Sequence, residues 1–254
     1  HLLAAQKKER DDINKMVHAL QQAVMRLRYS AKPVVTAPYG LTLGGGCEIA
    51  IHGDRVRAAG ETYIGLVEVG VGVIPAGGGT KEMTMRAMDA AQKATDADPL
   101  TFLKKSFEMI GMGKVATSAQ EGKAWGFFRD VDSISMNGDR LIADAKQEVL
   151  NLDASGYVQP VQREDIFVMG EAGQAAMKLA LHMMKQGGFI SDHDQLIGKK
   201  LAKVMSGGDM NHSAFVSEQY LLDLEREAFV SLCGERKAQD RIAAMLKTGK
   251  PLRN

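Results

Sequence analysis

The sequence predicts an α/β protein in which a small mixed part is followed by a larger, mostly helical region. Two patterns support this prediction. Short β-branched and glycine-rich runs alternate with helical patterns up to about residue 97, and helical periodicity dominates from Pro99 onward. The chain has 254 residues, of which 45% are hydrophobic, which suits one large globular domain or two smaller ones. We therefore expect two parts, residues 1–97 and residues 98–254.

The elements of the first part follow from periodicity and from turn residues. Apolar residues at helical spacing predict an amphipathic helix over about residues 6–28, which Pro33 ends. The run PVVTAP predicts a strand, YGLTLGGG a turn, GCEIAIHG a short helix and DRVRAAG a second strand. Residues 63–80 predict strand fragments and tight loops, and a helix follows from Thr80.

The second part is predicted to be helical apart from one connection. Several segments after Pro99 have apolar residues at helical spacing and end in glycine, which commonly stops a helix. Residues 153–173 lack such a pattern and predict an irregular connection. The run SDHDQ, residues 191–195, is compatible with a cation site, but its first serine favours a helix N-cap.

Composition excludes several classes of function. The net charge of +1 gives no indication of a nucleic acid or a membrane surface as partner. No apolar stretch reaches the roughly 18 residues of a membrane span. Cys47 and Cys233 are the only cysteines, too few for a disulfide framework, so we expect a reducing cytoplasm. The histidines make no metal-ligand spacing, so no metal is expected.

Three glycines and two glutamates are the candidate site residues. Gly44, Gly45 and Gly46 open a predicted helix, where free amides and the helix dipole favour a developing negative charge. Glu48 follows in that helix, and Glu68 stands among apolar residues in LVEV. Two neighbouring carboxylates shift each other's pKa values, so one suits an acid and the other a base. The alternatives are a tightly packed turn and two structural carboxylates.

Two glycine-rich stretches do not fit nucleotide-binding loops. In GVGVIPAGGG, Pro75 stands where a dinucleotide fingerprint has its third glycine. In GGGTK, threonine precedes lysine, which is the reverse of the order in a P-loop. The sequence therefore gives no nucleotide-binding motif of its own.

Residues 32–83 resemble the central block of the enoyl-CoA hydratase, or crotonase, superfamily. The stretches that carry the resemblance are KPVVTAP, GLTLGGGCEIA, DRVRAAG, IGLVEVG and VIPAGGGT, in the family's order and without gaps. Residues 116–132 also resemble the helix and strand that follow the family's core. The resemblance implies a partial crotonase ββα spiral over residues 1–97 and helices that cover it over residues 98–254.

The resemblance also implies roles for three residues. Gly45 matches the family's oxyanion glycine, and Glu48 and Glu68 match its two catalytic glutamates. We expect Glu48 to activate a water as base and Glu68 to protonate C2 of a trans-2-enoyl-CoA, giving 3-hydroxyacyl-CoA in fatty-acid β-oxidation. Other family members shift double bonds with a single carboxylate, so an isomerase is the alternative. Tyr39, Val67 and Ala76 depart from the usual Asn, Pro and Gly.

The chain further resembles the C-terminal half of bacterial fusions of 3-hydroxyacyl-CoA dehydrogenase with enoyl-CoA hydratase. The resembling stretches are residues 65–83 and the ending from Glu225 to Asn254. This resemblance implies that NAD binds only in a dehydrogenase domain outside this chain and that a second oxyanion amide precedes His1. The chain would then be a fragment, active only with its upstream part, or a docking or oligomerisation unit. We expect an acyl-CoA partner and possible self-association into a homo-oligomer.

Overall fold

Parallel strands organise the part of the molecule that carries the candidate residues. The computed structural model describes residues 10–254. One sheet has the order β1 (Val35–Thr36), β3 (Arg55–Ala59) and β5 (Ser133–Ser135), and both pairs of neighbours run parallel. A second sheet pairs β2 (Leu41–Leu43) in parallel with β4 (Tyr63–Gly65). The alternation of short strands and helices agrees with the predicted α/β class.

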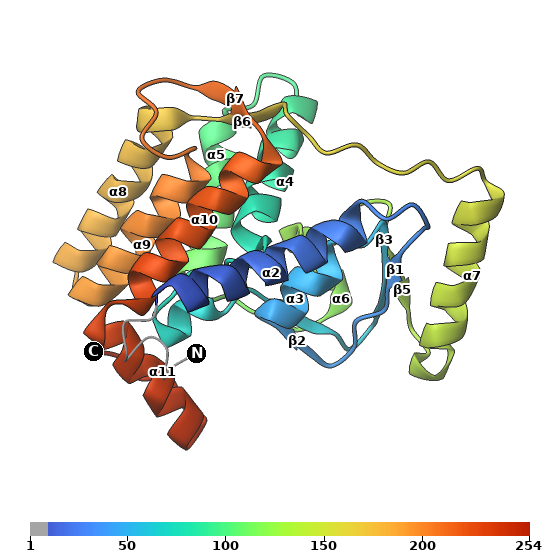
Figure 1. The fold of residues 1–254 in the computed structure, drawn as a ribbon, viewed down its shortest axis with the longest axis horizontal. Coiled ribbons are helices and arrows are strands. Elements are labelled where there is room, and N and C mark those ends of the chain that lie inside the picture. The colour runs from blue at the N-terminus through green and yellow to red at the C-terminus, as the bar shows by residue number, and fades with distance from the viewer. Residues whose placement is uncertain (1–9) are drawn as a thin grey trace.

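Helices make up most of the remainder. They are α2 (Arg10–Arg28), α3 (Gly45–Ile51), α4 (Gly79–Lys93), α5 (Pro99–Gly111), α6 (Ala119–Trp125), α7 (Leu141–Ala154), α8 (Gly170–Gln186), α9 (Asp192–Met205), α10 (Glu218–Cys233) and α11 (Arg236–Thr248). Two 3₁₀ turns, η1 (Glu68–Val71) and η2 (Gly138–Arg140), precede longer elements. In Figure 1, α8, α9 and α10 lie side by side at one end of the molecule, while α7 lies at the other end against β1 and β3.

Local rules account for the ends of these helices. Ser191 accepts a hydrogen bond from the Asp194 amide, and the Asp194 side chain accepts one from the Ser191 amide, which makes a capping box for α9. SDHDQ is therefore a helix start, as predicted. Gly126 and Gly249 follow α6 and α11 with left-handed backbone angles, which glycine adopts without a steric cost.

Three short strands lie where the sequence pattern predicts none. β2 occupies the predicted turn YGLTLGGG, and β6 (Ile166–Val168) occupies the predicted irregular connection. β6 pairs antiparallel with β7 (Ala214–Val216), and the rings of Phe167 and Phe215 meet edge to face. Three residues are too few for a readable alternation, so pairing with a distant segment decides these strands.

The core connects the two predicted parts. One cluster of buried side chains contains Ile51 and Ile74 from the first part and Leu103, Phe127 and Leu201 from the second. β5, from the second part, also pairs with β3 from the first. The division at residue 97 stays a prediction. Among the described residues, no helix has the length and apolar character needed to cross a membrane.

Candidate active site

The parallel pairing of β2 with β4 brings Gly45 and Glu68 to the same edge. Leu43 lies opposite Gly65 in the register, and the Gly44 amide donates to the Gly65 carbonyl at 2.9 Å. Both strands therefore end at this edge, one leading into α3 and the other into η1. The strand pair is the element that positions these two candidate residues.

The N-terminus of α3 presents free amides to an open space. Its first helical hydrogen bond runs from the Glu48 amide to the Gly44 carbonyl, so the amides of Gly45 and Gly46 lie before the helical bonding pattern. Both glycines are exposed, and a Cβ added at either would meet no atom within 4 Å. The Gly45 amide is therefore open to a ligand oxygen at the positive end of the helix.

Glu48 points inward from α3 and is held by the start of α4. Its carboxylate is buried, and its Oε1 accepts hydrogen bonds from the Gly77 and Gly79 amides, each at 2.8 Å. Burial raises the pKa of Glu48 to about 7, although these two amides and the Lys81 ammonium oppose the rise. Glu48 is therefore close to half-ionised at neutral pH, which suits a general base.

The glycines of this loop are required by the close approach of Glu48. A Cβ on Gly77 would lie 2.5 Å from Glu48 Oε2, and one on Gly79 would lie 2.8 Å from Glu48 Oε1. Side chains at either position would push the carboxylate away from the amides that bind it. The sequence AGGGT is thus a carboxylate-binding loop in this structure.

Glu68 is the second carboxylate of the site. Its Oε2 is shielded from solvent and has no hydrogen-bond partner among the described residues, while its Oε1 approaches the Gly44 backbone. Burial, and then the charge of Glu48, hold the pKa of Glu68 well above its usual range. Glu68 therefore holds its proton more strongly than a free carboxyl group does, which suits a general acid.

Two charged residues near Glu48, Glu225 and Lys81, were not singled out by the sequence analysis. Glu225 of α10 is fully buried, and burial with the neighbouring charge of Glu48 raises its pKa to about 8. The buried Lys81 ammonium donates to Glu218 at 3.0 Å and to Glu82 at 3.3 Å. The sequence analysis did not find these groups because they come from two helices that are distant in the sequence, α4 and α10. Within each helix, the residues stand in an ordinary helical pattern.

His52 connects Glu48 to this charged group. Its Nδ1 lies 2.6 Å from the Glu48 carbonyl and its Nε2 lies 3.2 Å from the Lys81 ammonium. A carbonyl only accepts and an ammonium only donates, so Nδ1 carries the proton and Nε2 accepts. Burial lowers the pKa of His52 to about 3, which keeps the ring neutral.

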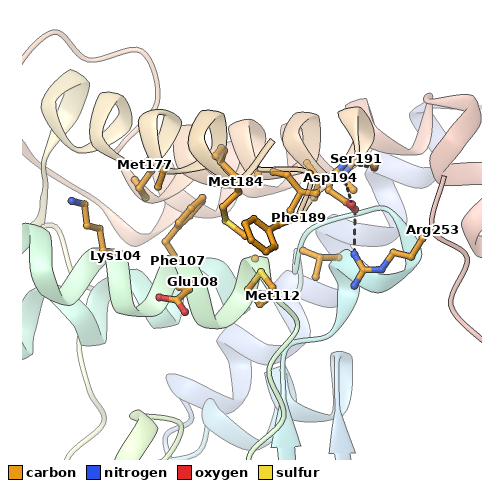
Figure 2. Close-up of a pocket in the computed structure, with 18 residues that line it drawn as sticks. Lys104, Phe107, Glu108, Met112, Met177, Met184, Phe189, Ser191, Asp194 and Arg253 are labelled. Atoms are coloured by element: carbon orange, nitrogen blue, oxygen red, sulfur yellow. Dashed lines mark hydrogen bonds and ion pairs between the residues drawn. The ribbon is translucent and has the colours of Figure 1, made fainter. Parts of the chain in front are cut away.

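A cavity of about 720 Å³ lies between α5, α8 and α9. Val69, the residue after Glu68 in the chain, lines it, whereas Gly45, Glu48 and Glu68 do not. Figure 2 shows Met177, Met184 and Phe189 facing Phe107 and Met112 across this cavity. Charged side chains stand at its ends, Lys104 at one and Asp194 with Arg253 at the other. Its size and largely apolar lining are those of a small-molecule pocket.

Comparison with known proteins finds relatives in sequence and in fold. Residues 2–98 match the family model described as enoyl-CoA hydratase/isomerase. These residues belong to the enoyl-CoA hydratase/isomerase family. Solved structures of the family share the fold: an enoyl-CoA hydratase from Bacillus halodurans aligns with a TM-score of 0.58 at 17% identity, covering 96% of this chain and 72% of that one.

Two curated relatives are similar in sequence. A protein of Bacillus subtilis (strain 168) named probable 3-hydroxyacyl-CoA dehydrogenase is 46% identical over 243 residues, which are 96% of this chain and 30% of that protein. A crotonyl-CoA hydratase of Syntrophomonas wolfei subsp. wolfei is 46% identical over 66 residues, covering 26% of this chain and 25% of that protein. The chain thus spans less than a third of the length of either relative.

Proposed function

We propose that this chain catalyses the reversible hydration of trans-2-enoyl-CoA to 3-hydroxyacyl-CoA in fatty-acid β-oxidation. The observation that carries the proposal is the pairing of two shielded carboxylates, Glu48 and Glu68, beside the open amide of Gly45. Glu68 Oε1 lies close to Gly44, and the Gly44 carbonyl accepts a hydrogen bond from the Glu48 amide, so both acids are placed at the start of α3. The family of residues 2–98 and the name of the crotonyl-CoA hydratase relative support the same reaction.

In the proposed reaction, each of these groups has one role. The thioester oxygen accepts a hydrogen bond from the Gly45 amide, which stabilises the enolate that forms. Glu48 takes a proton from water as the water oxygen bonds to C3, and Glu68 donates a proton to C2. One O–H bond and the C2–C3 π bond are replaced by a C–O and a C–H bond. Exchange of protons with solvent then restores both carboxyl groups.

We assign the acyl chain of the substrate to the cavity between α5, α8 and α9. Val69, which follows the proposed acid in the chain, is one of the residues that line this largely apolar cavity. Methionines at positions 112, 177 and 184 are adaptable, so they suit flexible chains of varied length. The thioester would then remain at Gly45 while the chain extends past η1.

We further propose that the native polypeptide joins this hydratase to a 3-hydroxyacyl-CoA dehydrogenase, as the name of the Bacillus subtilis relative suggests. NAD would bind in that dehydrogenase part, and the hydratase product would be its substrate. The two free cysteines, Cys47 and Cys233, are compatible with the cytoplasm as the place of action. The mass of the native polypeptide, measured after isolation from its source, tests the fusion directly.

The central test is hydration of crotonyl-CoA by the native protein and by Glu48→Gln and Glu68→Gln. Each substitution keeps the side-chain shape but removes proton transfer, so we expect kcat to fall by about 10²–10⁴. Loss of absorbance of the conjugated thioester gives the rate, and circular dichroism checks that the variants fold. Undiminished turnover in both variants would contradict the assignment. Conversion of 3-enoyl-CoA without hydration would instead identify an isomerase, which needs one carboxylate.

A further inference from the structure

Glu225 is a buried carboxylate that the proposed reaction does not use directly. It lies on α10, and both of its oxygens accept hydrogen bonds from the start of α4. Oε1 accepts from the Gly78 amide at 2.5 Å and from the Gln21 amide group at 3.3 Å, and Oε2 accepts from the Lys81 amide at 3.0 Å. A carboxylate that is completely buried costs stability unless its oxygens are bonded in this way.

The glycine loop, residues 77–79, also binds Glu48, through the amides on either side of Gly78. Gly77 and Gly79 donate to Glu48, and Gly78, which lies between them, donates to Glu225. Successive amides of the loop therefore point to two different carboxylates from two different helices. Glycine backbones have wide conformational freedom, so a loop of three glycines needs such external bonds to keep one arrangement.

We propose that Glu225 is a positioning residue for hydration, because it fixes the glycine loop whose amides aim the Glu48 carboxylate at the catalytic water. This inference depends on the proposed function. Glu225 does not contact the substrate; it acts through the Gly78 and Lys81 amides. The loop would otherwise be able to rotate the Gly77 and Gly79 amides away from Glu48 Oε1.

Glu218 offers a matched comparison on the same helix. It is also fully buried, but its partners are the Lys81 ammonium, the Tyr29 hydroxyl and the Arg163 amide. It accepts no hydrogen bond from the Gly77–Gly79 loop. Loss of Glu218 therefore weakens packing and an ion pair around α10 without releasing the amides that hold Glu48.

The test compares Glu225→Leu, Glu225→Gln and Glu218→Gln in the native protein. Leucine keeps the bulk and accepts no hydrogen bond, whereas glutamine keeps one oxygen acceptor. We expect Glu225→Leu to lower kcat for crotonyl-CoA by about 10²-fold, as small misplacements of catalytic groups do, with KM changed by less than about threefold. We expect Glu225→Gln to retain kcat within about tenfold, and Glu218→Gln to lower Tm while retaining kcat.

Amide hydrogen exchange supplies a measurement that does not depend on the reaction. Exchange at Gly77 and Gly79 should accelerate in Glu225→Leu by at least about tenfold and stay near the native rate in Glu218→Gln. Unchanged exchange and unchanged kcat in Glu225→Leu would overturn the proposal, as would an equal loss of kcat in Glu218→Gln. If the native protein hydrates nothing, the proposed function fails, and the exchange result alone decides whether Glu225 orders the loop.

Discussion

At the scale of single residues, burial sets the chemistry of this site more than charge pairing does. Glu48 is buried, and Glu68 is partly buried with its Oε2 shielded, so both carboxyl groups hold protons more strongly than they would in solution. The two amides on Glu48 partly restore its charge, whereas Glu68 Oε2 receives no hydrogen bond from the described residues. This asymmetry supports the assignment of Glu48 as base and Glu68 as acid.

The pH dependence of kcat/KM should reflect this asymmetry. Glu48 must be deprotonated to take a proton from water, so kcat/KM should rise as pH increases through about 7. Glu68 must be protonated, so kcat/KM should fall again at higher pH, because its pKa is raised well above the usual range. The rise and the fall of this pH profile report apparent pKa values of the two interacting carboxyl groups together, so neither value belongs to a single residue. Initial rates with crotonyl-CoA across this range give the profile; a rate that does not vary from about pH 5.5 to 8.5 would contradict it.

At the scale of elements, the amides at the start of α3 lie at the positive end of a short helix. Gly44 and Gly45, which are neighbours at this helix start, differ in backbone angle and in surroundings. Gly44 has a φ of 55°, and a Cβ at this position would lie 3.1 Å from Glu68 Oε1. Gly45 has ordinary helical geometry and open space around it, so the fold itself does not require a glycine at this position.

The two glycines should therefore respond differently to substitution by alanine. Gly44→Ala should lower the free energy of unfolding by about 1–3 kcal/mol, because alanine is strained at that backbone angle. Gly45→Ala should change it by less than about 1 kcal/mol but lower kcat/KM by about tenfold or more, since the methyl group occupies space for the thioester. Urea unfolding and crotonyl-CoA kinetics measure the two effects. Equal losses of stability in both variants would show that Gly45 serves packing.

At the scale of the whole molecule, segments far apart in the sequence enclose the cavity. Val69, Phe107, Ile197 and Arg253 all line it, and they come from η1, α5, α9 and the end of the chain. The closely packed pair α8 and α9 forms one wall, where Gly198 allows Leu181 to approach its backbone. Apart from Val69, every residue that lines the cavity comes from the second predicted part of the chain, residues 98–254.

Filling the cavity should change the preference for chain length. Ala180 lines the cavity on α8, whereas Leu179 beside it is 61% exposed. Ala180→Trp should lower kcat/KM for trans-2-hexadecenoyl-CoA by about tenfold or more and leave that for crotonyl-CoA within about threefold, because only the long chain needs the blocked space. Leu179→Trp is the control, with the native preference expected. A parallel loss for both substrates in Ala180→Trp would argue against this route for the chain.

Residue patterns predicted the order of the first helices and the α/β class, and a family resemblance in residues 32–83 implied the roles that we propose for Gly45, Glu48 and Glu68. Each depends on nearby residues: helical spacing, caps, and the glycines directly before α3. Other features became visible only in the folded molecule. They are the pairing of β2, β6 and β7, the set of residues that line the cavity, and the hydrogen bond of 2.5 Å between the Gly78 amide and Glu225. These features join segments up to about 150 residues apart, and a pattern read within one window carries no information on contacts at that distance.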